Sequence, residues 1–147
     1  MMIDDVMVQL VGGIRHLPER KNQGDAGADL RSRINAIIPP GEYVNIPTGV
    51  KVVIPYEYVG LVFSRSGLAT RCGLRLSNCV GVIDSGYRGE ILVPLYNDSD
   101  EVQTVTEGDR IAQLLIMRVE LPEFMAVEQL PESERGEGGF GSTGVRE

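Results

Sequence analysis

The sequence of 147 residues has no tryptophan, one histidine and two cysteines. Cys72, Cys79 and His16 are too few, and wrongly spaced, to form a zinc cage. They also give no disulfide framework of a secreted protein, so we expect two small core thiols in a reducing compartment. His16 has no evident partner in the sequence, and we expect it on the surface or in a loop.

Long apolar segments are missing as well. No stretch approaches the ~18 apolar residues of a membrane-spanning helix, and residues 1–5 lack the basic start and apolar core of a secretory signal. Acidic residues outnumber basic ones by 21 to 14, for a net charge of −7, which disfavours binding to a nucleic-acid backbone. These absences favour a cytoplasmic protein that binds neither membrane nor nucleic acid. They leave room for a small anion held by a few arginines and a divalent cation.

Short apolar segments separated by turn residues fill most of the chain. Valine and isoleucine dominate them, and branched side chains suit a pleated surface. Such segments at this spacing are typical of an all-β domain. The expected strands are Val6 to Leu10, Ala36 to Ile38, Tyr43 to Ile46, Val50 to Ile54, Tyr58 to Phe63, Leu74 to Leu76, Val80 to Ile83, Ile91 to Leu95, Val102 to Val105 and Phe124 to Val127. Residues 1–130 are expected to form the β domain, and residues 131–147 a linker and tail.

Helical segments are hard to find in this pattern. Asp109 to Leu121 runs 13 residues without glycine or proline and fits either an Asp-capped helix or a fully buried strand. Its apolar residues define no single face, which favours the strand. Ser66 to Thr70 is expected to form a single helical turn. The prediction is therefore an all-β fold with at most one short helix.

The segment Arg135 to Gly144 holds five glycines in ten residues. Glycine loses the most backbone entropy on ordering, so this tail is expected to be flexible until something orders it. It nevertheless carries Arg135, Phe140 and two hydroxyl side chains, which are the groups needed to close over an anion that bears a flat ring. A flexible terminus without a role is the alternative.

The stretch Asn78 to Ile91 is expected to form a strand, a tight turn and a second strand. Asp84 stands where the first strand ends, three residues before Tyr87. Asp-Ser-Gly is ordinary turn chemistry, but a carboxylate fixed at the end of a strand can also orient and deprotonate a water. If the two strands of this hairpin part slightly, their backbone groups and the Asn78 amide match the edge of uracil.

Three further places carry groups suited to binding ions. Arg65 to Ala69 offers a guanidinium, a hydroxyl and free N–H groups at the start of a helical turn. Asp25 and Asp29 could hold the water shell of Mg²⁺. Gln113 is an amide inside an apolar run, so it either bonds the backbone or points into a site. A capped surface turn and a solvated loop are the alternatives for the first two places.

Taken together and in this order, five segments closely resemble the trimeric dUTPase family. They are Ala26 to Leu30, Arg65 to Ala69, Asn78 to Gly89, Gly108 to Gln113 and Arg135 to Gly144. The resemblance implies a distorted jelly-roll-like β-barrel or sandwich over essentially the whole chain, and a homotrimer in which three subunits build each active site. The chain departs from the family at Ala28, where many members carry an aromatic residue, and we expect this to alter packing but not chemistry. The resemblance leaves the role of Asp25 unclear.

The resemblance also implies a reaction and roles for individual residues. The reaction is the Mg²⁺-dependent hydrolysis of dUTP to dUMP and pyrophosphate, which limits uracil in DNA and supplies dUMP for dTMP synthesis. Asp84 would activate the water that attacks the α-phosphorus, and Tyr87 would pack beneath the deoxyribose and exclude a 2′-hydroxyl. Asp29 would hold the metal through water. The other implied substrate contacts are Asn78, Gly81 and Ile83 for uracil, Arg65, Ser66, Gly67 and Gln113 for the phosphates, and Arg135, Phe140, Gly141 and Ser142 in the closing tail.

Two other functions remain open from the sequence. A dCTP deaminase shares the implied fold, but its chemistry needs an acid or base beside the pyrimidine C4, and the segment Val82 to Tyr87 resembles the hydrolase version instead. A non-catalytic nucleotide-binding regulator is a different class of protein. The complete set of Asp84, Tyr87, Gln113 and tail argues against it.

Overall fold

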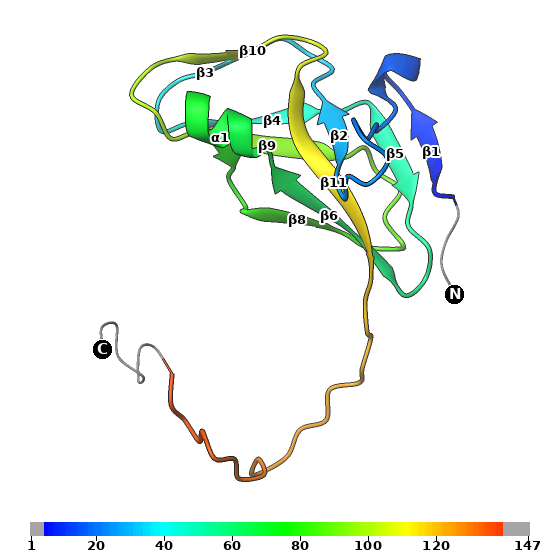
Figure 1. Ribbon diagram of the computed structural model, residues 1–147, viewed down its shortest axis with the longest axis vertical. Coiled ribbons are helices and arrows are strands. Elements are labelled where there is room, and N and C mark those ends of the chain that lie inside the picture. Colours follow the sequence, from blue (N-terminus) through cyan, green and yellow to red (C-terminus); the bar gives the residue numbers. More distant parts are fainter. Residues whose placement is uncertain (1–4, 140–147) are drawn as a thin grey trace.

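Short β-strands account for most of the regular structure in residues 5–139, the part of the chain that the computed structural model describes (Figure 1). One α-helix and one 3₁₀ turn join them within these residues. In chain order the elements are β1 (Met7–Leu10), η1 (Ile14–His16), β2 (Ala28–Arg31), β3 (Ala36–Ile38), β4 (Tyr43–Pro47), β5 (Val50–Val53), β6 (Tyr58–Ser64), α1 (Ser66–Cys72), β7 (Leu74–Leu76), β8 (Val80–Ile83), β9 (Leu92–Asn97), β10 (Gln103–Val105) and β11 (Arg110–Arg118). The predicted all-β fold with one short helix is confirmed.

The strands form antiparallel sheets of two to four strands. The largest has the order β2-β11-β6-β8, and a second has the order β4-β9-β7. The pairs β1-β5 and β3-β10 complete the arrangement. Among the described residues no sheet closes on itself, so the fold is an open sandwich and not a closed barrel.

The core lies between the two larger sheets. Val62 of β6 and Leu114 of β11 are buried on one side, and Ile46 of β4 and Leu95 of β9 are buried on the other. Side chains alternate along these strands, as they do where one face of a sheet packs on a core and the other does not. In β9, for example, Leu95 is fully buried while Leu92 is half exposed. This alternation explains why the short apolar segments of the sequence are strands.

The ambiguous segment Asp109 to Leu121 forms strand β11, as predicted. Its central residues pair with both β2 and β6, but it is not fully buried as expected. The pairing with β2 ends at Leu114, whereas the pairing with β6 continues to Arg118. The last part of β11 therefore has a neighbour on one side only, and Met117 is 49% exposed.

One strand was not predicted, and two strand predictions are wrong. Ala28–Arg31 forms β2, although its small and charged residues gave no strand pattern. Phe124 to Val127 has no strand structure. The expected hairpin between Asn78 and Ile91 does not form, because β8 pairs with β6 while β9 pairs with β4 and β7. Chain neighbours thus belong to different sheets, and the local turn signal did not determine the pairing.

Two burial predictions are also wrong. His16 is not a surface residue but is 1% exposed, and its Nδ1 lies 3.0 Å from the backbone oxygen of Thr48. Cys79 is not a core residue but is exposed, while Cys72 is half-buried at the end of α1. Both cysteines are free thiols.

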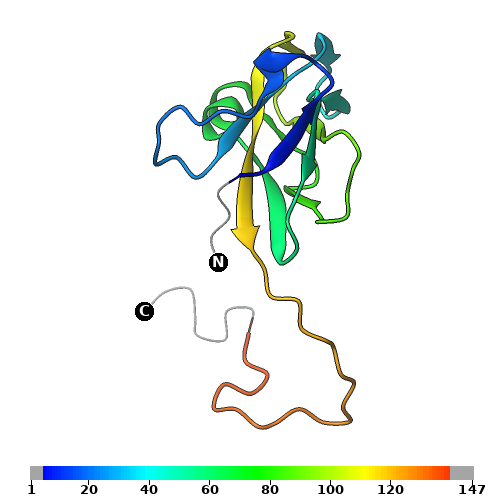
Figure 2. The same ribbon diagram turned by 90° about the vertical axis from the view of Figure 1, so that its right-hand side faces the viewer.

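Beyond Arg118 the chain leaves the body of the protein as an extended segment (Figures 1 and 2). Residues 120–137 are all exposed, and Phe124 and Met125 are 99% and 84% exposed. Within residues 5–139, no helix has the length and apolar character needed to cross a membrane. The predicted tail residues Phe140, Gly141 and Ser142 lie outside the described residues.

Candidate functional site

A pocket of about 370 Å³ opens where β2, β11 and the start of α1 meet. The register explains this meeting, since Gln113 of β11 pairs with Asp29 on one side and with Phe63 of β6 on the other. The chain that follows β6 enters α1 beside the same pocket. The residues that line this pocket are Lys21, Asp25, Ala26, Gly27, Asp29, Arg65, Ser66, Gly67, Arg110 and Gln113. The pocket therefore collects most of the segments predicted to hold phosphates, from three parts of the chain.

Asp29 organises the cationic side of this pocket. Its Oδ1 lies 2.9 Å from Nε of Arg65, and its Oδ2 lies 3.2 Å from Nη1 of Arg110. The carboxylate is 18% exposed, so it is mostly withdrawn from water and held by both guanidinium groups. With Lys21 added, three cationic side chains face two carboxylates, and the pocket carries an excess of positive charge suited to an anion.

Gln113 both bonds the backbone and lines the pocket. Its Nε2 donates a hydrogen bond to the Ser64 carbonyl oxygen at 2.9 Å. A Cβ atom at Gly27 would overlap Oε1 of the same amide. Both interpretations left open by the sequence therefore hold, and the close approach of the loop before β2 requires a glycine at position 27.

Helix α1 begins at the edge of the pocket without a capping side chain. Arg65 occupies the N-cap position in an extended conformation, and its side chain makes no capping hydrogen bond. Ser66 and Gly67 line the pocket there. The N–H groups at the start of a helix carry partial positive charge, which adds to that of the arginines.

The Asp84 turn lies in a different region. Asp84 follows the last residue of β8, and its carbonyl oxygen accepts a hydrogen bond from the N–H of Tyr87 at 3.0 Å. The Tyr87 hydroxyl donates to the Glu90 carbonyl oxygen at 2.9 Å. Asp84 is exposed and Tyr87 is 42% exposed. The turn thus presents a solvated carboxylate beside an accessible aromatic ring.

Strand β8 has an open backbone edge. In the four-stranded sheet it pairs with β6 alone, and alternate residues of such an edge strand direct their N–H and C=O groups away from the sheet. The Asn78 amide lies near the same strand, since a Cβ at Gly81 would be 3.8 Å from its Nδ2. Gly81 and Ile83 both belong to β8. The hairpin is absent, but the unpaired backbone groups expected of it are present on this strand.

A single chain does not bring all the predicted site residues together. Ile83 pairs with Gly60, five residues before Arg65. At about 3.4 Å per residue, the Asp84 turn and the phosphate-type pocket lie about 17 Å apart along β6. Arg135 lies in the exposed tail, where its Nε donates to the Gly138 carbonyl oxygen at 2.7 Å.

Two cationic residues of the pocket were not singled out from the sequence. Arg110 belongs to the Gly108 to Gln113 segment, and its position next to a predicted strand could have indicated that it lies in the pocket. Lys21 lies in a loop with no spacing rule to distinguish it. Both line the same pocket as Arg65.

The pocket fits Mg²⁺ only as a partner of bound phosphates. No three histidine, cysteine or acidic side chains between residues 5 and 139 gather as a metal cage. Asp25 and Asp29 both line the pocket, but the oxygens of Asp29 already face two arginines. Mg²⁺ binds through few protein ligands and keeps several waters, so these carboxylates suit hydrogen bonds to metal-bound water.

Comparison with known proteins gives consistent matches. A family model described as dUTPase matches residues 15–144. The chain is 51% identical over 134 residues to the deoxyuridine 5′-triphosphate nucleotidohydrolase of Mycolicibacterium gilvum, with 87% of each chain covered. It is 48% identical over 141 residues to the enzyme of the same name from Streptomyces coelicolor, covering 95% of this chain and 77% of that protein.

Solved structures resemble this fold closely. A mutant dUTPase of Staphylococcus bacteriophage 80alpha, bound to dUpNHpp, matches with a TM-score of 0.86 and 34% identity over 97% of this chain and all of that one. A mutant dUTPase from phage phi11 of S. aureus matches with a TM-score of 0.76 and 31% identity over 86% of this chain and 98% of that one. That structure is described in terms of the coordination of a structural Mg(II) ion.

Proposed function

The chain belongs to the dUTPase family and hydrolyses dUTP to dUMP and pyrophosphate, and we propose that Asp84 is the general base of this reaction. The observation that carries the assignment is the cationic pocket in which Asp29 holds Arg65 and Arg110. It is suited to a triphosphate, and a solvated carboxylate at the end of β8 is suited to activating water. The reaction removes dUTP and yields dUMP for the synthesis of dTMP.

The pocket binds the phosphates of dUTP in this proposal. Arg65, Ser66, Gly67 and Gln113 line it together with Arg110. Hydrolysis of a phosphoanhydride needs little covalent help, so positioning and neutralisation of charge account for most of the rate. Guanidinium groups already fixed by a carboxylate lose little conformational freedom when they bind phosphate. This favours both the positioning of the phosphates and the neutralisation of their charge.

Asp84 orients and deprotonates the water that attacks the α-phosphorus. Its place after a paired strand and at the start of a hydrogen-bonded turn fixes its backbone, and its exposure leaves the carboxylate open to water. A positioned carboxylate of this kind acts as a general base. Tyr87, three residues on, packs beneath the deoxyribose and leaves no space for a 2′-hydroxyl.

The edge of β8 reads the base. Uracil presents one N–H between two carbonyl oxygens, and the backbone around Gly81 and Ile83 offers unpaired groups of complementary kind. The Asn78 amide, which lies beside Gly81, supplies a further donor and acceptor. Close approach of the ring to the backbone excludes a 5-methyl group.

We assign the complete active site to a homotrimer with shared sites. The backbone separation of about 17 Å between the Asp84 turn and the chain's own Arg65 supports this, because it is long for two side chains that must both reach the phosphates of one nucleotide. The tail supports it too, since Phe124 and Met125 are almost fully exposed in the isolated chain and need a partner to cover them. Arg135, Phe140, Gly141 and Ser142 then close over the nucleotide of another subunit.

Mg²⁺ is the proposed cofactor, and when bound it neutralises charge on the phosphates. Asp29 would hold it through water, with Asp25 in the same pocket. The two free cysteines suit the reducing cytoplasm, where we place the enzyme.

Pyrophosphate release from dUTP, dCTP, dTTP and UTP tests the function directly. Rapid release from dUTP alone is expected. Ammonia release from dCTP would identify a deaminase of the same fold instead. Tight binding of a dUTP analogue without any pyrophosphate release would identify a nucleotide-binding regulator.

A further inference from the structure

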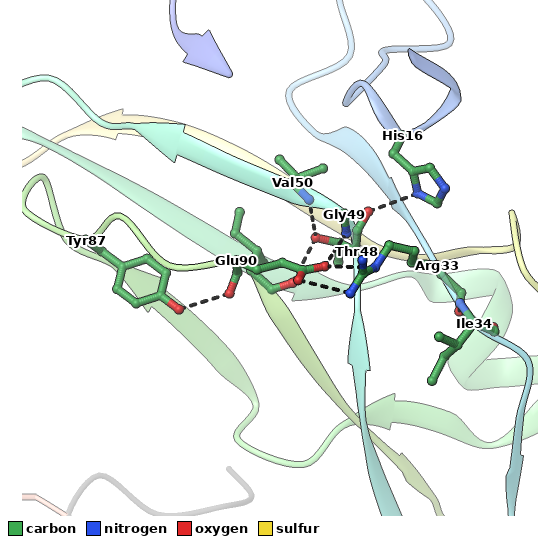
Figure 3. Close-up of polar contacts among 10 residues, drawn as sticks. His16, Arg33, Ile34, Thr48, Gly49, Val50, Tyr87 and Glu90 are labelled. Carbon is green, nitrogen blue, oxygen red and sulfur yellow. Dashed lines mark hydrogen bonds and ion pairs between the residues drawn. The ribbon is translucent and has the colours of Figure 1, made fainter. Parts of the chain in front are cut away.

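The stretch Tyr87 to Ile91, which follows the Asp84 turn, is fastened to the turn between β4 and β5 (Figure 3). The N–H of Ile91 donates to the Val50 carbonyl oxygen at 2.8 Å, and the Thr48 hydroxyl donates to the Ile91 carbonyl oxygen at 2.8 Å. These bonds hold the end of the stretch. The remaining anchor is a side chain, that of Glu90.

Glu90 is held by three contacts at once. Its Oε1 accepts a hydrogen bond from the N–H of Gly49 at 2.7 Å and lies 3.3 Å from Nε of Arg33. Its Oε2 accepts from Nη2 of Arg33, also at 3.3 Å. The Glu90 side chain is 19% exposed, and a carboxylate so far removed from water needs such partners. The pair therefore gives Glu90 one well-defined position.

Glu90 also contacts the Tyr87 ring. The Tyr87 hydroxyl donates to the Glu90 backbone oxygen at 2.9 Å, so the ring is tied to the residue whose side chain Arg33 holds. Gly89 lies beneath it, where any Cβ would overlap the hydroxyl and the ring. Figure 3 shows the chain of contacts running from Arg33 through Glu90 to Tyr87.

The other side of this anchor is rigid as well. Gly49 has φ +76°, and a Cβ there would lie 3.0 Å from the Gly12 backbone nitrogen, so the turn requires glycine. His16 is buried against the same turn, with its Nδ1 3.0 Å from the Thr48 carbonyl oxygen. The Glu90 carboxylate therefore accepts a hydrogen bond from the Gly49 N–H, whose position is fixed by the packing of its turn.

We propose that Arg33 and Glu90 are positioning residues for the Tyr87 ring, and that through it they set the preference for 2′-deoxyribose over ribose nucleotides. The inference rests on the proposed role of Tyr87 beneath the sugar. A 2′-hydroxyl is excluded only by lack of space, and one small group discriminates by about 10- to 200-fold when the fit is tight. Loosening the backbone of Glu90 lets the ring withdraw and admits the hydroxyl.

The test uses Glu90→Gln, which retains an acceptor for Gly49 but not the ion pair, and Arg33→Met, which retains the bulk of the side chain. We expect each to lower the ratio of kcat/KM for dUTP over UTP by at least about 10-fold. Most of this change should come from improved use of UTP, with kcat for dUTP little changed. Arg33→Lys should restore part of the selectivity.

A double-mutant cycle distinguishes positioning from a merely structural role. In a Tyr87→Phe background the ring is no longer bonded to Glu90, so adding Glu90→Gln should leave the selectivity ratio unchanged. Glu107→Gln is the matched control, because Glu107 forms an exposed pair with Arg15, and it should leave the ratio at the wild-type value.

The outcomes separate cleanly. A selectivity ratio unaltered in both Glu90→Gln and Arg33→Met would overturn the inference, whatever happens to thermal stability. An equal loss of activity on dUTP and UTP would also overturn it. If the wild-type protein fails to hydrolyse dUTP, the proposed function itself is wrong.

Discussion

Ile83 lies opposite Gly60 across the ladder of β6 and β8. This register places the proposed base, Asp84, at one end of β6, while Arg65 follows the other end. If Asp84 is the base and Arg65 binds phosphate, as proposed, their places at opposite ends of one strand favour a site shared between two subunits.

Mixing two inactive variants should therefore restore activity. Asp84→Asn subunits supply an intact Arg65, and Arg65→Ala subunits supply an intact Asp84. In a trimer with shared sites, random mixing at equal amounts gives roughly one quarter of the sites both residues. The measurement is pyrophosphate release after unfolding and refolding the mixture, with each variant refolded alone as its control. No gain above the separate variants would show that each subunit has a complete site.

Asp84→Asn should bind nucleotide and lose nearly all turnover. The amide retains the size of the carboxylate but cannot take a proton, and loss of a general base typically lowers the rate by about 10²- to 10⁴-fold. Steady-state kcat and calorimetric binding of a non-hydrolysable dUTP analogue measure the two effects. A near-normal kcat would remove Asp84 from the catalytic role.

Deleting residues 135–147 should leave a folded protein with poor catalysis. Among residues 5–139 the last strand ends at Arg118, and residues 135–137 are exposed, so we expect the β sandwich to fold without this segment. Closure of the tail over substrate excludes water and completes the site, and its loss should lower kcat/KM by at least about 100-fold. Circular dichroism checks the fold, and unchanged kinetics after truncation would contradict the closing role.

Gly27→Ala should weaken catalysis by disturbing Gln113. The added Cβ would overlap Oε1 of Gln113, so the amide or the loop before β2 must move out of position. We expect kcat/KM for dUTP to fall by between about 10- and 100-fold. Gly24→Ala is the control in the same loop, because its Cβ would have no neighbour within 4 Å. Equal kinetics for both variants would exclude a role for this close approach.

Leu95→Ala should destabilise the sandwich by about 2–5 kcal/mol, the usual cost of emptying a fully buried leucine site. Thr104→Ala, on the exposed side of β10, should change the free energy of unfolding by less than about 0.5 kcal/mol. Urea unfolding at one fixed protein concentration compares them, since association contributes to apparent stability. If Leu95→Ala lowered the free energy of unfolding by less than about 1 kcal/mol, the burial of Leu95 in the core would be contradicted.

The sequence could predict those features that depend on near neighbours. Alternating and branched residues identified most strands, including β11, and the end of β8 placed Asp84 at the start of a turn. The resemblance to a family then joined segments that local patterns could not join. Features that depend on distant partners were missed, because no local signal encodes them.

His16 and Glu90 illustrate the missing information. His16 is buried by Thr48, 32 residues away, and nothing near it in the sequence indicates this partner. Glu90 pairs with Arg33, 57 residues away, and each alone looks like an ordinary surface charge. The prediction of a hairpin was wrong for the same reason, because β8 pairs with β6, a strand that the local turn signal does not indicate.

The open edge of β8 has a consequence for handling the protein. Unpaired backbone groups on a strand invite pairing with a strand of any other molecule, and Val82 adds an apolar side chain that is 62% exposed. A pyrimidine seated on that edge would occupy the same donors and acceptors. Nucleotide in the storage buffer should therefore act as a shield against slow precipitation, independently of any turnover.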